Sequence, residues 1–384
     1  MRDIYGGAVK KVLFIVPSLR NAGAETQVVD LVNSIDPRFA QKYLFTFEHD
    51  MSQFGRVEHA HVQVHNVPRR SKFDLSMCTE IARLIDREQI DLVHCTMQFS
   101  LLIGWVARRR AKRKPPLVCA IHITRNKNLK TELQDLLLYQ WLLLACDKLI
   151  FVCEAQRMHW TRKFFGLARK AEVVHNGVDP EYFSAPPFGA ERLLFRKHHR
   201  IAQDSTVFCC IAGFRSEKGH LILLQAFAGV LATCPQAFLI LAGDGPTRQT
   251  AQNYADHHGI AAHVVFTGNV SDVRPILAAS DIKVIASTSV ETFSVAMLEA
   301  MSMGLPVIST AIGGAAEAVI EDQTGMLVPI ADAGALGAAM THAIADRHRL
   351  RAWGIAARLM VAERFNKHGM VDKTVDVLRR TMHA

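Results

Sequence analysis

The sequence predicts an α/β protein made of two consecutive doubly wound domains, and three observations carry this prediction. Short apolar runs alternate with helix-like segments in the first 175 residues, a stretch rich in turn-forming residues follows, and the alternation then restarts. Alternating strands and helices form mostly parallel sheets with helices on both faces. A chain of 384 residues is long enough for two such domains, each with its own core.

In the first half, strands are predicted from short apolar runs, and helices from longer segments with apolar residues at helical spacing. The expected strands are 11–17, 43–47, 62–67, 92–95, 117–123, 149–152 and 172–174. The expected helices are 24–34, 74–87, 101–110 and 132–145.

The stretch 176–190 is predicted to be a linker. Asn176 and Asp179 belong to a run with strong turn chemistry, and 184–189 contains two prolines and a glycine. We therefore expect domains over 1–180 and 190–364.

The same reading of the second half gives strands and helices in regular alternation. The expected strands are 206–211, 238–242, 264–266, 281–286, 307–309 and 326–328. The expected helices are 221–231, 247–258, 273–279, 294–303, 333–344 and 348–364. A last helix within 365–384 is expected to pack back on the first domain.

Composition places the chain among globular proteins, because 49% of the residues are apolar and mean hydropathy is +0.11. No apolar stretch is long enough to span a bilayer, and the first residues lack the apolar core of a signal peptide. The eight cysteines show no C-x-x-C pair and no zinc-ligand spacing, so we expect reduced core residues and no metal. These features predict a cytoplasmic protein.

The net charge is +9, and its densest part is the basic run from Arg108 to Lys114. Such a run is most often a solvated helix end. The functional alternatives are contact with an anionic membrane and contact with nucleic acid. No nucleic-acid-binding motif accompanies the run, so peripheral membrane contact is the better of the two and no nucleic-acid partner is expected.

Two glutamates eight residues apart, Glu291 and Glu299, are the most informative pair in the chain. Glu291 falls in the loop after a buried strand, and Glu299 lies about two turns into the following helix. Ligands of open α/β sheets bind at the carboxyl ends of strands, and free N–H groups at a helix N-terminus favour anions. The alternative is that Glu291 is a solvated loop residue and Glu299 a surface helix residue.

Several motifs in order make the chain resemble family 4 glycosyltransferases, which are retaining enzymes of the GT-B fold with an E-x7-E motif. The resemblance implies two Rossmann-like domains facing each other across a cleft, and it runs from about residue 11 to 330. The motifs are NAGAETQ (21–27), IHITR (121–125), LIFVCEAQ (149–156), HNGVD (175–179), AGFRSEKGH (212–220), LAGDGP (241–246), FTGNVSDVRPILAASDI (266–282), ETFSVAMLEAMSMGLPVIST (291–310) and GGAAEAV (313–319).

The chemistry of such a transferase suits the residues of the second half. The leaving nucleoside diphosphate gains negative charge as the glycosidic bond breaks, and the sequence has no D-x-D-like metal site to neutralise it. Lys218 is the best candidate cation, and the N–H groups of Phe293 and Ser294 at a helix start suit phosphate oxygens. The resemblance implies that Glu299 binds ribose hydroxyls and that Glu291 contacts the donor sugar.

One position departs from the family pattern. Many members have an arginine five residues before the lysine, where this chain has Gly213, and its nearest arginine is Arg215. Arg215 is therefore a candidate for contact with the diphosphate, with a surface role as the alternative.

Two candidates lie in the first domain. Gly23, which has no side chain, would let backbone approach the phosphates, although a simple helix-start turn explains it equally well on local chemistry. His122 follows an apolar run at the carboxyl end of a strand, and the resemblance implies a hydrogen bond near the reacting sugar, whereas a lone histidine is more often structural.

Three further residues of the second domain complete the expected nucleotide site. Gly243 and Gly245 are expected to form a turn under the nucleotide, and the backbone of Val270 is expected to contact the base. No G-x-G-x-x-G follows the first strand, which disfavours an NAD-dependent dehydrogenase.

The sequence therefore predicts a metal-independent hexosyltransferase without a cofactor, with a UDP- or GDP-sugar as donor and a sugar or lipid-linked sugar as acceptor. The expected setting is cell-surface polysaccharide or glycolipid biosynthesis at the inner face of the plasma membrane. The alternatives are another GT-B enzyme, such as a nucleotide-sugar epimerase or a sucrose-type synthase, and a non-catalytic subunit that binds nucleotide sugars.

Overall fold

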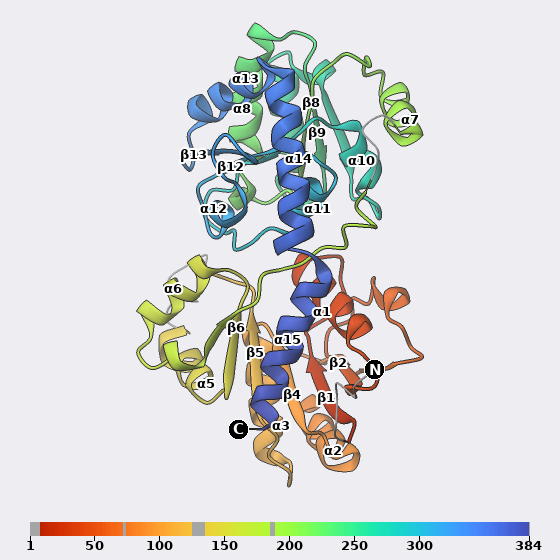
Figure 1. Ribbon diagram of the computed structural model, residues 1–384, viewed down its shortest axis with the longest axis vertical. Helices are drawn as coiled ribbons and strands as arrows, with labels where there is room; N and C mark the ends of the chain where they lie inside the picture. Colours follow the sequence, from red (N-terminus) through yellow and green to blue (C-terminus); the bar gives the residue numbers. More distant parts are fainter. Residues whose placement is uncertain (1–7, 72–73, 125–134, 185–188, 384) are drawn as a thin grey trace. The chain divides into compact units, whose positions relative to one another are not determined.

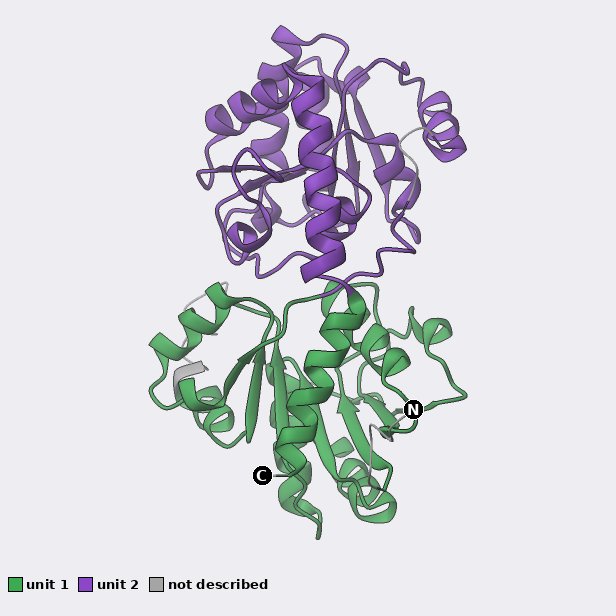
Figure 2. Ribbon diagram, in the orientation of Figure 1, with its two compact units in different colours: residues 1–176, 367–384 green, residues 177–366 purple. Residues whose placement is uncertain are grey.

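The chain folds into two α/β units. The computed structural model describes residues 8–71, 74–124, 135–184 and 189–383. Unit 1 contains residues 1–176 and 367–384, and unit 2 contains residues 177–366 (Figure 2). The chain therefore divides after residue 176. Apart from residue 176, the predicted linker 176–190 belongs to unit 2.

Unit 1 is built on a seven-stranded sheet with the order β3-β2-β1-β4-β5-β6-β7, and every neighbouring pair is parallel (Figure 1). Its strands lie where the sequence predicts them, with ends that differ by up to three residues. They are β1 (Lys10–Ile15), β2 (Ala40–Thr46), β3 (Val62–Asn66), β4 (Leu92–Thr96), β5 (Leu117–Ile121), β6 (Lys148–Phe151) and β7 (Ala171–Val173).

Helices connect these strands and cover the sheet. They are α1 (Gly23–Ser34), η1 (Phe54–Arg56), α2 (Met77–Glu88), α3 (Gln98–Arg110), the π-helix η2 (Asp135–Tyr139), α5 (Gln140–Leu144), α6 (Glu154–Lys163) and η3 (Ala168–Lys170). Part of the helix predicted over 132–145 lies outside the described residues. The last helix of the chain, α15 (Lys367–Met382), contacts α1 within unit 1.

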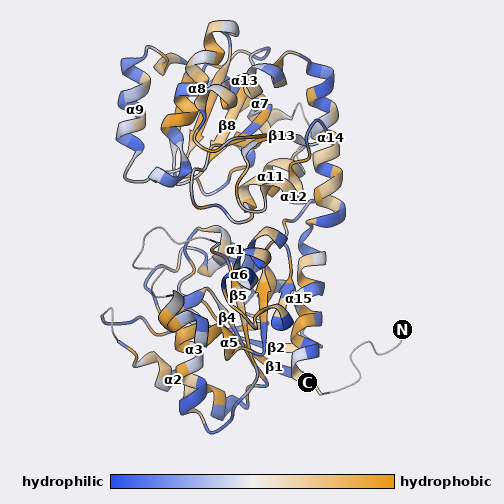
Figure 3. Ribbon diagram, turned by 90° about the vertical axis from the view of Figure 1, so that its left-hand side faces the viewer, coloured by the Kyte–Doolittle hydropathy of each residue, from blue (hydrophilic) through white to orange (hydrophobic). Residues whose placement is uncertain are grey.

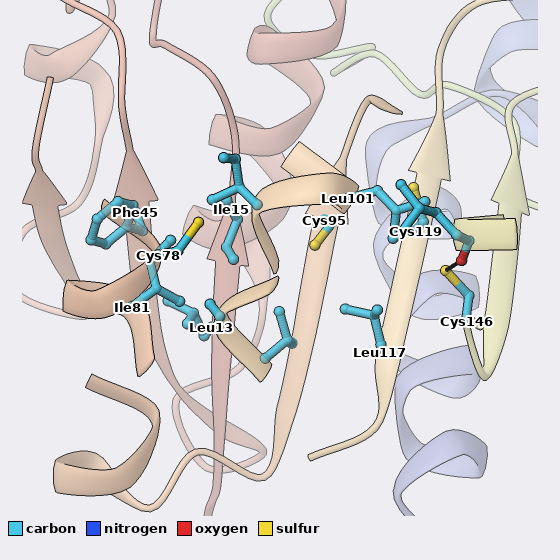
Figure 4. Packing of buried hydrophobic residues seen from close by; sticks show 14 of the residues in the cluster. Leu13, Ile15, Phe45, Cys78, Ile81, Cys95, Leu101, Leu117, Cys119 and Cys146 are labelled. Atoms are coloured by element: carbon cyan, nitrogen blue, oxygen red, sulfur yellow. Dashed lines mark hydrogen bonds between the residues drawn. The ribbon is translucent and has the colours of Figure 1, made fainter. Parts of the chain in front are cut away.

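The core of unit 1 contains most of its cysteines. Cys95, Cys119 and Cys146 lie among leucines and isoleucines from neighbouring strands (Figure 4). The Cys146 thiol donates a hydrogen bond to the carbonyl of Leu142 at 3.4 Å. Burial holds the pKa of all three thiols well above the usual value, so they remain protonated at neutral pH. All eight cysteines of the chain are free thiols.

Unit 2 has a six-stranded sheet with the order β10-β9-β8-β11-β12-β13, also parallel throughout (Figure 1). All six predicted strands are present. They are β8 (Val207–Ile211), β9 (Phe238–Ala242), β10 (Val264–Gly268), β11 (Ile282–Ile285), β12 (Val307–Thr310) and β13 (Gly325–Val328).

The helices of unit 2 include two that the sequence did not predict, α7 and α12. The set is α7 (Ala190–His198), η4 (Ser216–Lys218), α8 (His220–Thr233), α9 (Arg248–His257), η5 (Ala261–His263), α10 (Arg274–Ala279), α11 (Val295–Ser302), α12 (Ala315–Ala318), α13 (Ala333–Ile344) and α14 (Arg347–Arg364). Figure 3 shows hydrophobic residues concentrated in the strands, whereas α9 is largely hydrophilic.

Part of the basic run, which begins in the last turn of α3, is engaged in local structure. The Lys114 ammonium donates to the carbonyls of Arg108 and Arg109 and so caps the end of α3. Arg113 pairs with Asp91 at 2.7 Å. Local contacts at the end of α3 therefore explain why Arg113 and Lys114 stand in this run. None of the helices in the described part of the chain combines the length and the apolarity that a membrane span needs.

Candidate functional site

The sequence-predicted residues of unit 2 gather at the carboxyl edge of its sheet. The loops after β8, β9, β11 and β12 all open at this edge because the four strands are parallel. This is the edge at which open α/β sheets bind ligands.

An ion pair between Lys218 and Glu291 forms the centre of this edge. The Lys218 Nζ donates to Glu291 Oε2 at 2.8 Å, and both side chains are largely buried, with 16% and 14% of their surface exposed. The Ser287 hydroxyl donates to the same carboxylate oxygen at 2.8 Å. The other oxygen, Oε1, has no hydrogen-bond partner among the described residues, so it is available to a ligand hydroxyl.

A glycine brings these two residues together although 73 positions separate them in the chain. Gly219 has φ +67°, and a Cβ there would lie 2.0 Å from the carbonyl oxygen of Ala286, just after β11. The Thr288 N–H donates to the Glu217 carbonyl at 2.8 Å. The loop after β8 is thus fastened to the loop after β11, which places Lys218 beside Glu291.

A second glycine holds the Glu291 loop from the other side. Gly313 has φ +59°, and a Cβ there would lie 2.4 Å from the carbonyl oxygen of Glu291 and 2.5 Å from that of Thr292. The Gly314 N–H donates to the Thr292 carbonyl at 2.6 Å. The loop after β12 therefore supports the backbone that carries Glu291.

Helix α11 begins directly after Glu291. The Ser294 hydroxyl is its N-cap and accepts from the Met297 N–H at 3.3 Å, so this hydroxyl is already engaged. The N–H groups of the first turn point out of the helix start, where they suit an anion. Phe293 is 3% exposed and packs edge-on against Phe365, so only its backbone can face a ligand. Glu299 lies half-buried about one turn after the start of α11.

The loop after β9 contributes Gly243 and Gly245. A Cβ at Gly243 would lie 2.2 Å from the Ala212 carbonyl oxygen, and one at Gly245 would lie 2.5 Å from that of Phe214. Both glycines have positive φ, of +133° and +148°. They let this loop lie against the segment that follows β8. Val270, just after β10, is partly buried against the core of unit 2.

Arg215 lies at the rim of this edge. Its guanidinium is 3.1 Å from Glu217 Oε1, and 53% of its side-chain surface is exposed, against 8% for Glu217. Its charge is therefore matched by a carboxylate of its own loop.

Sequence reasoning missed a buried histidine in unit 2. His220 stacks on Phe214 with ring centroids 4.1 Å apart, two residues after Lys218. Burial is the main cause that lowers the pKa of His220 to about 4, and the charge of Lys218 is the second. The ring is therefore neutral at pH 7. A neutral ring next to Lys218 adds no charge to the site.

In unit 1, Gly23 is the first residue of α1 and follows the carboxyl end of β1. Two residues later Glu25, which the sequence did not single out, is 1% exposed and accepts from Arg20 Nε at 2.7 Å. Its Oε2 is buried and has no hydrogen-bond partner among the described residues. Burial raises the pKa of this carboxyl. Its burial distinguishes it, and the local sequence gives no signal of that burial.

His122 directly follows β5, at the carboxyl edge of the unit 1 sheet. Burial lowers its pKa to about 4, so the ring is neutral at pH 7 and can either donate or accept a hydrogen bond. His94 on β4 is close enough to be influenced by it, and burial lowers the pKa of His94 to about 3. Gly23, Glu25 and His122 thus lie at the carboxyl edge of the unit 1 sheet.

Within the described residues no group of three or more His, Cys, Asp or Glu side chains is arranged to hold a metal ion.

Comparison with known proteins identifies the class to which this fold and site belong. The family model described as Glycosyltransferase Family 4 matches residues 21–182, and the model described as Glycosyl transferases group 1 matches residues 191–360. The chain belongs to the family 4 glycosyltransferases, and its fold class is GT-B. It is a glycosyltransferase.

Among curated relatives, the N-acetyl-alpha-D-glucosaminyl L-malate synthase of Bacillus anthracis is 26% identical over 325 residues, which cover 83% of each chain. The GDP-mannose-dependent alpha-(1-6)-phosphatidylinositol monomannoside mannosyltransferase of Mycobacterium tuberculosis is 31% identical over 241 residues, or 61% of this chain and 62% of that one. A solved structure of HepE from Anabaena, in complex with UDP and glucose, superposes with a TM-score of 0.84 at 23% identity and covers 96% of this chain and 99% of its own.

Proposed function

We propose that this chain is a retaining glycosyltransferase that moves a sugar from a nucleoside-diphosphate sugar to a hydroxyl acceptor, in the biosynthesis of a cell-surface polysaccharide or glycolipid. The observation that carries the proposal is the ion pair between Lys218 Nζ and Glu291 Oε2, 2.8 Å long, next to the N-terminus of α11. It combines a cation for phosphate, a carboxylate for sugar hydroxyls and a helix start for anionic oxygens.

The transfer breaks the bond between the anomeric carbon and the diphosphate and forms a new bond from that carbon to the acceptor oxygen. The bonding electrons stay on the diphosphate, and the acceptor proton leaves to a phosphate oxygen or to water. Negative charge therefore grows on the diphosphate. The Lys218 ammonium has three donors and Glu291 takes one of them, so two remain for phosphate oxygens.

Glu291 has a separate role in this proposal. Its Oε2 is occupied by Lys218 and Ser287, and its Oε1 can accept from a hydroxyl of the donor sugar. The carboxylate thus aligns the sugar relative to the cation that binds the phosphates. Glu299, further along the same helix, is assigned to the ribose hydroxyls.

The reaction proposed here uses no divalent cation and no cofactor. A preorganised ammonium and the dipole of a helix start stabilise developing charge without one. Retention of anomeric configuration rests on the resemblance to family 4 enzymes.

The donor is proposed to be a UDP- or GDP-sugar. HepE, which shares the fold, has been solved with UDP-glucose, and the mycobacterial relative is named as GDP-mannose-dependent. The acceptor is proposed to be a sugar or a lipid-linked sugar held by unit 1, with the neutral ring of His122 hydrogen bonding near the reacting sugar. Arg215 is assigned an auxiliary role at the diphosphate once its pairing with Glu217 loosens.

The proposed setting is the cytoplasmic face of the plasma membrane, reached by peripheral contact. Unit 1 exposes several large apolar side chains, among them Leu137 by 65%, Trp141 by 66% and Phe165 by 96%. The basic run adds Arg109, which lies over the Trp105 ring at 4.7 Å. Exposed aromatic and basic groups together favour an anionic bilayer surface.

The test is a screen of UDP- and GDP-sugars with the purified protein, in which release of the free nucleoside diphosphate is measured with and without acceptor mixtures. One donor should be consumed, and the product linkage should keep the anomeric configuration of the donor. A subunit that only binds nucleotide sugars would release no nucleoside diphosphate from any donor, and that result would contradict the proposal.

A further inference from the structure

Unit 2 contains a cavity of about 450 Å³ at the edge of its sheet opposite to the candidate donor site. Its walls include Thr206 just before β8, Asp281 just before β11 and Pro306 just before β12. The carboxyl ends of these three parallel strands lie at the candidate donor site, which is the edge that holds Lys218 and Glu291. The cavity therefore lies at the amino ends of the strands. The wall that closes it is α14, which contacts α11 (Figure 1).

The lining of this cavity is strongly basic. Four arginines line it against a single carboxylate, that of Asp281: Arg192, Arg347, Arg351 and Arg358. The Asp281 oxygens are already occupied, since Oδ1 accepts from Arg192 at 2.7 Å and Oδ2 accepts from Arg196 at 2.9 Å. The excess positive charge is therefore not matched by the protein.

Three of these arginines have no carboxylate partner. Arg347 donates only to the backbone carbonyl of Asp204, at 2.7 Å. Arg351 and Arg358, seven positions apart on α14, have neither an ion-pair nor a hydrogen-bond partner among the described residues. Positions seven apart lie on one face of a helix, so both guanidinium groups can reach one ligand.

A buried hydroxyl also lacks a partner in this cavity. Ser205 is 3% exposed and belongs to the cavity wall, and its Oγ has no hydrogen-bond partner among the described residues. An unsatisfied buried hydroxyl destabilises the fold, and a ligand acceptor would satisfy it. The hydroxyl and the arginines both suit an oxyanion.

The rest of the wall is apolar. Leu277, Met303, Leu305, Leu350 and Ile355 line the cavity. Ile355 remains 64% exposed on α14, at a position where a surface helix normally carries a polar residue. A cavity with an apolar wall and a few convergent polar groups is the usual form of a small-molecule site.

We propose that this cavity binds a phosphate-bearing ligand with an apolar body, the phosphate on Arg351 and Arg358 and the apolar part against Leu305 and Ile355. This inference does not depend on the proposed transfer reaction, because none of these residues belongs to the donor site. The body of the ligand can be a lipid chain or the ring of a soluble phosphate ester.

The test is isothermal titration calorimetry on the full chain with four probes. Dihexanoyl phosphatidic acid represents the lipid source, and phenyl phosphate represents the soluble source. Inorganic phosphate lacks the apolar body, and dihexanoyl phosphatidylcholine lacks the accessible phosphate. Each titration is repeated in Lys218→Ala, which removes the donor-site cation, and binding to the cavity should be unchanged in that variant.

The decisive variant is Arg351→Gln/Arg358→Gln, whose side chains are exposed and have no partner in the described residues, so the fold should tolerate it. The matched control is Arg38→Gln/Arg83→Gln, two arginines of unit 1 that are 79% and 69% exposed. The cavity variant should lose about tenfold or more in affinity for whichever of dihexanoyl phosphatidic acid and phenyl phosphate the wild type binds. The control should lose no affinity. Ile355→Ser should weaken binding of that probe but not that of inorganic phosphate.

Tighter binding of phosphatidic acid would assign the site to a lipid, and tighter binding of phenyl phosphate would assign it to a soluble ester. Either result supports the proposal if the cavity variant abolishes the preference. The proposal is wrong if neither probe binds, if inorganic phosphate binds as tightly as both, or if the cavity variant binds like the wild type.

Discussion

The ammonium of Lys218 is the residue on which the proposed chemistry depends most. We expect Lys218→Ala to lower the rate of transfer by about a hundred- to thousandfold, because losing one preorganised donor costs about 2.7–4 kcal/mol of transition-state stabilisation. The measurement is kcat on the donor identified by the screen. EDTA should leave the wild type active, and added magnesium or manganese should not restore the variant. If chelation stops the wild-type reaction, the metal-free proposal is wrong.

The two glutamates should separate sugar contact from nucleotide contact. Glu291→Gln keeps the shape of the side chain but loses its charge, and its proposed ligand is the sugar, so transfer should fall severely while UDP or GDP binds as before. Glu299→Ala should weaken nucleotide binding itself, by about tenfold for a lost charge-assisted hydrogen bond. Calorimetric titration of the nucleotide measures both variants. Equal nucleotide affinity in Glu299→Ala and wild type would contradict the ribose assignment.

Residue types, spacing and the resemblance to family 4 enzymes led to Glu291, Glu299 and Lys218 as candidates. Glu25, His94 and His220 were missed for a physical reason. What distinguishes them is burial, which changes their pKa, and burial depends on packing partners far away in the sequence. Charge and spacing are local in the chain, whereas desolvation is not.

Among the elements, the short loops that contain glycines hold the site in shape. A Cβ at Gly219 would lie 2.0 Å from the Ala286 carbonyl oxygen, and its φ of +67° disfavours other residues. We therefore expect Gly219→Ala to lower the free energy of unfolding by at least about 1 kcal/mol and to move Lys218 away from Glu291, so that transfer also falls. Chemical denaturation and kcat measure the two effects.

The matched control is Gly229→Ala in the exposed part of α8, where a new Cβ meets nothing within 4 Å. There the same substitution should raise the free energy of unfolding by up to about 1 kcal/mol and leave kcat unchanged, because alanine favours a helix. If both variants behave alike, the close approach at Gly219 has no role in stability.

The elements that the sequence predicted are those with a clear apolar period. All seven strands of unit 1 and all six of unit 2 were predicted, since most are buried on both faces and such strands give continuous apolar runs. Helix α6 was missed because only Gln156 and Trp160 of its ten residues are buried. Helix α7 was missed because Leu193 and Leu194 are exposed by 51% and 66% while Arg196 is buried, which inverts the usual pattern.

The sequence did not predict the contact between Lys218 and Glu291. It requires β8 and β11 to be neighbours in the sheet, and the order β10-β9-β8-β11-β12-β13 reverses direction at that pair. This reversal is the topological switch point at which doubly wound sheets bind ligands. Local sequence does not encode strand order, so the alternation of elements predicts the sheet but not the place of the site on it.

At the scale of the whole molecule, each unit contains at least one histidine that burial keeps neutral. The stability of both units should therefore depend on pH in the acidic range. The pKa of His94 is lowered to about 3 and that of His220 to about 4, whereas each would titrate near 6.5 in the unfolded chain. As the pH falls below 6.5, the unfolded chain therefore binds protons that the folded chain does not, and stability falls until the pH approaches the folded pKa values.

The free energy of unfolding should consequently decrease between pH 6.5 and pH 4.5, by up to about 1.4 kcal/mol per pH unit for each buried histidine. Urea titrations at several pH values measure it, with separate probes for the two units because a chain of two units need not unfold in one step. His94→Gln should reduce the pH dependence of unit 1 without abolishing it, because His122 remains, and it should leave the pH dependence of unit 2 unchanged. The control His59→Gln, at an exposed position, should leave both slopes as they are. An unchanged slope in His94→Gln would mean that this histidine takes up its proton in the folded state as readily as in the unfolded one.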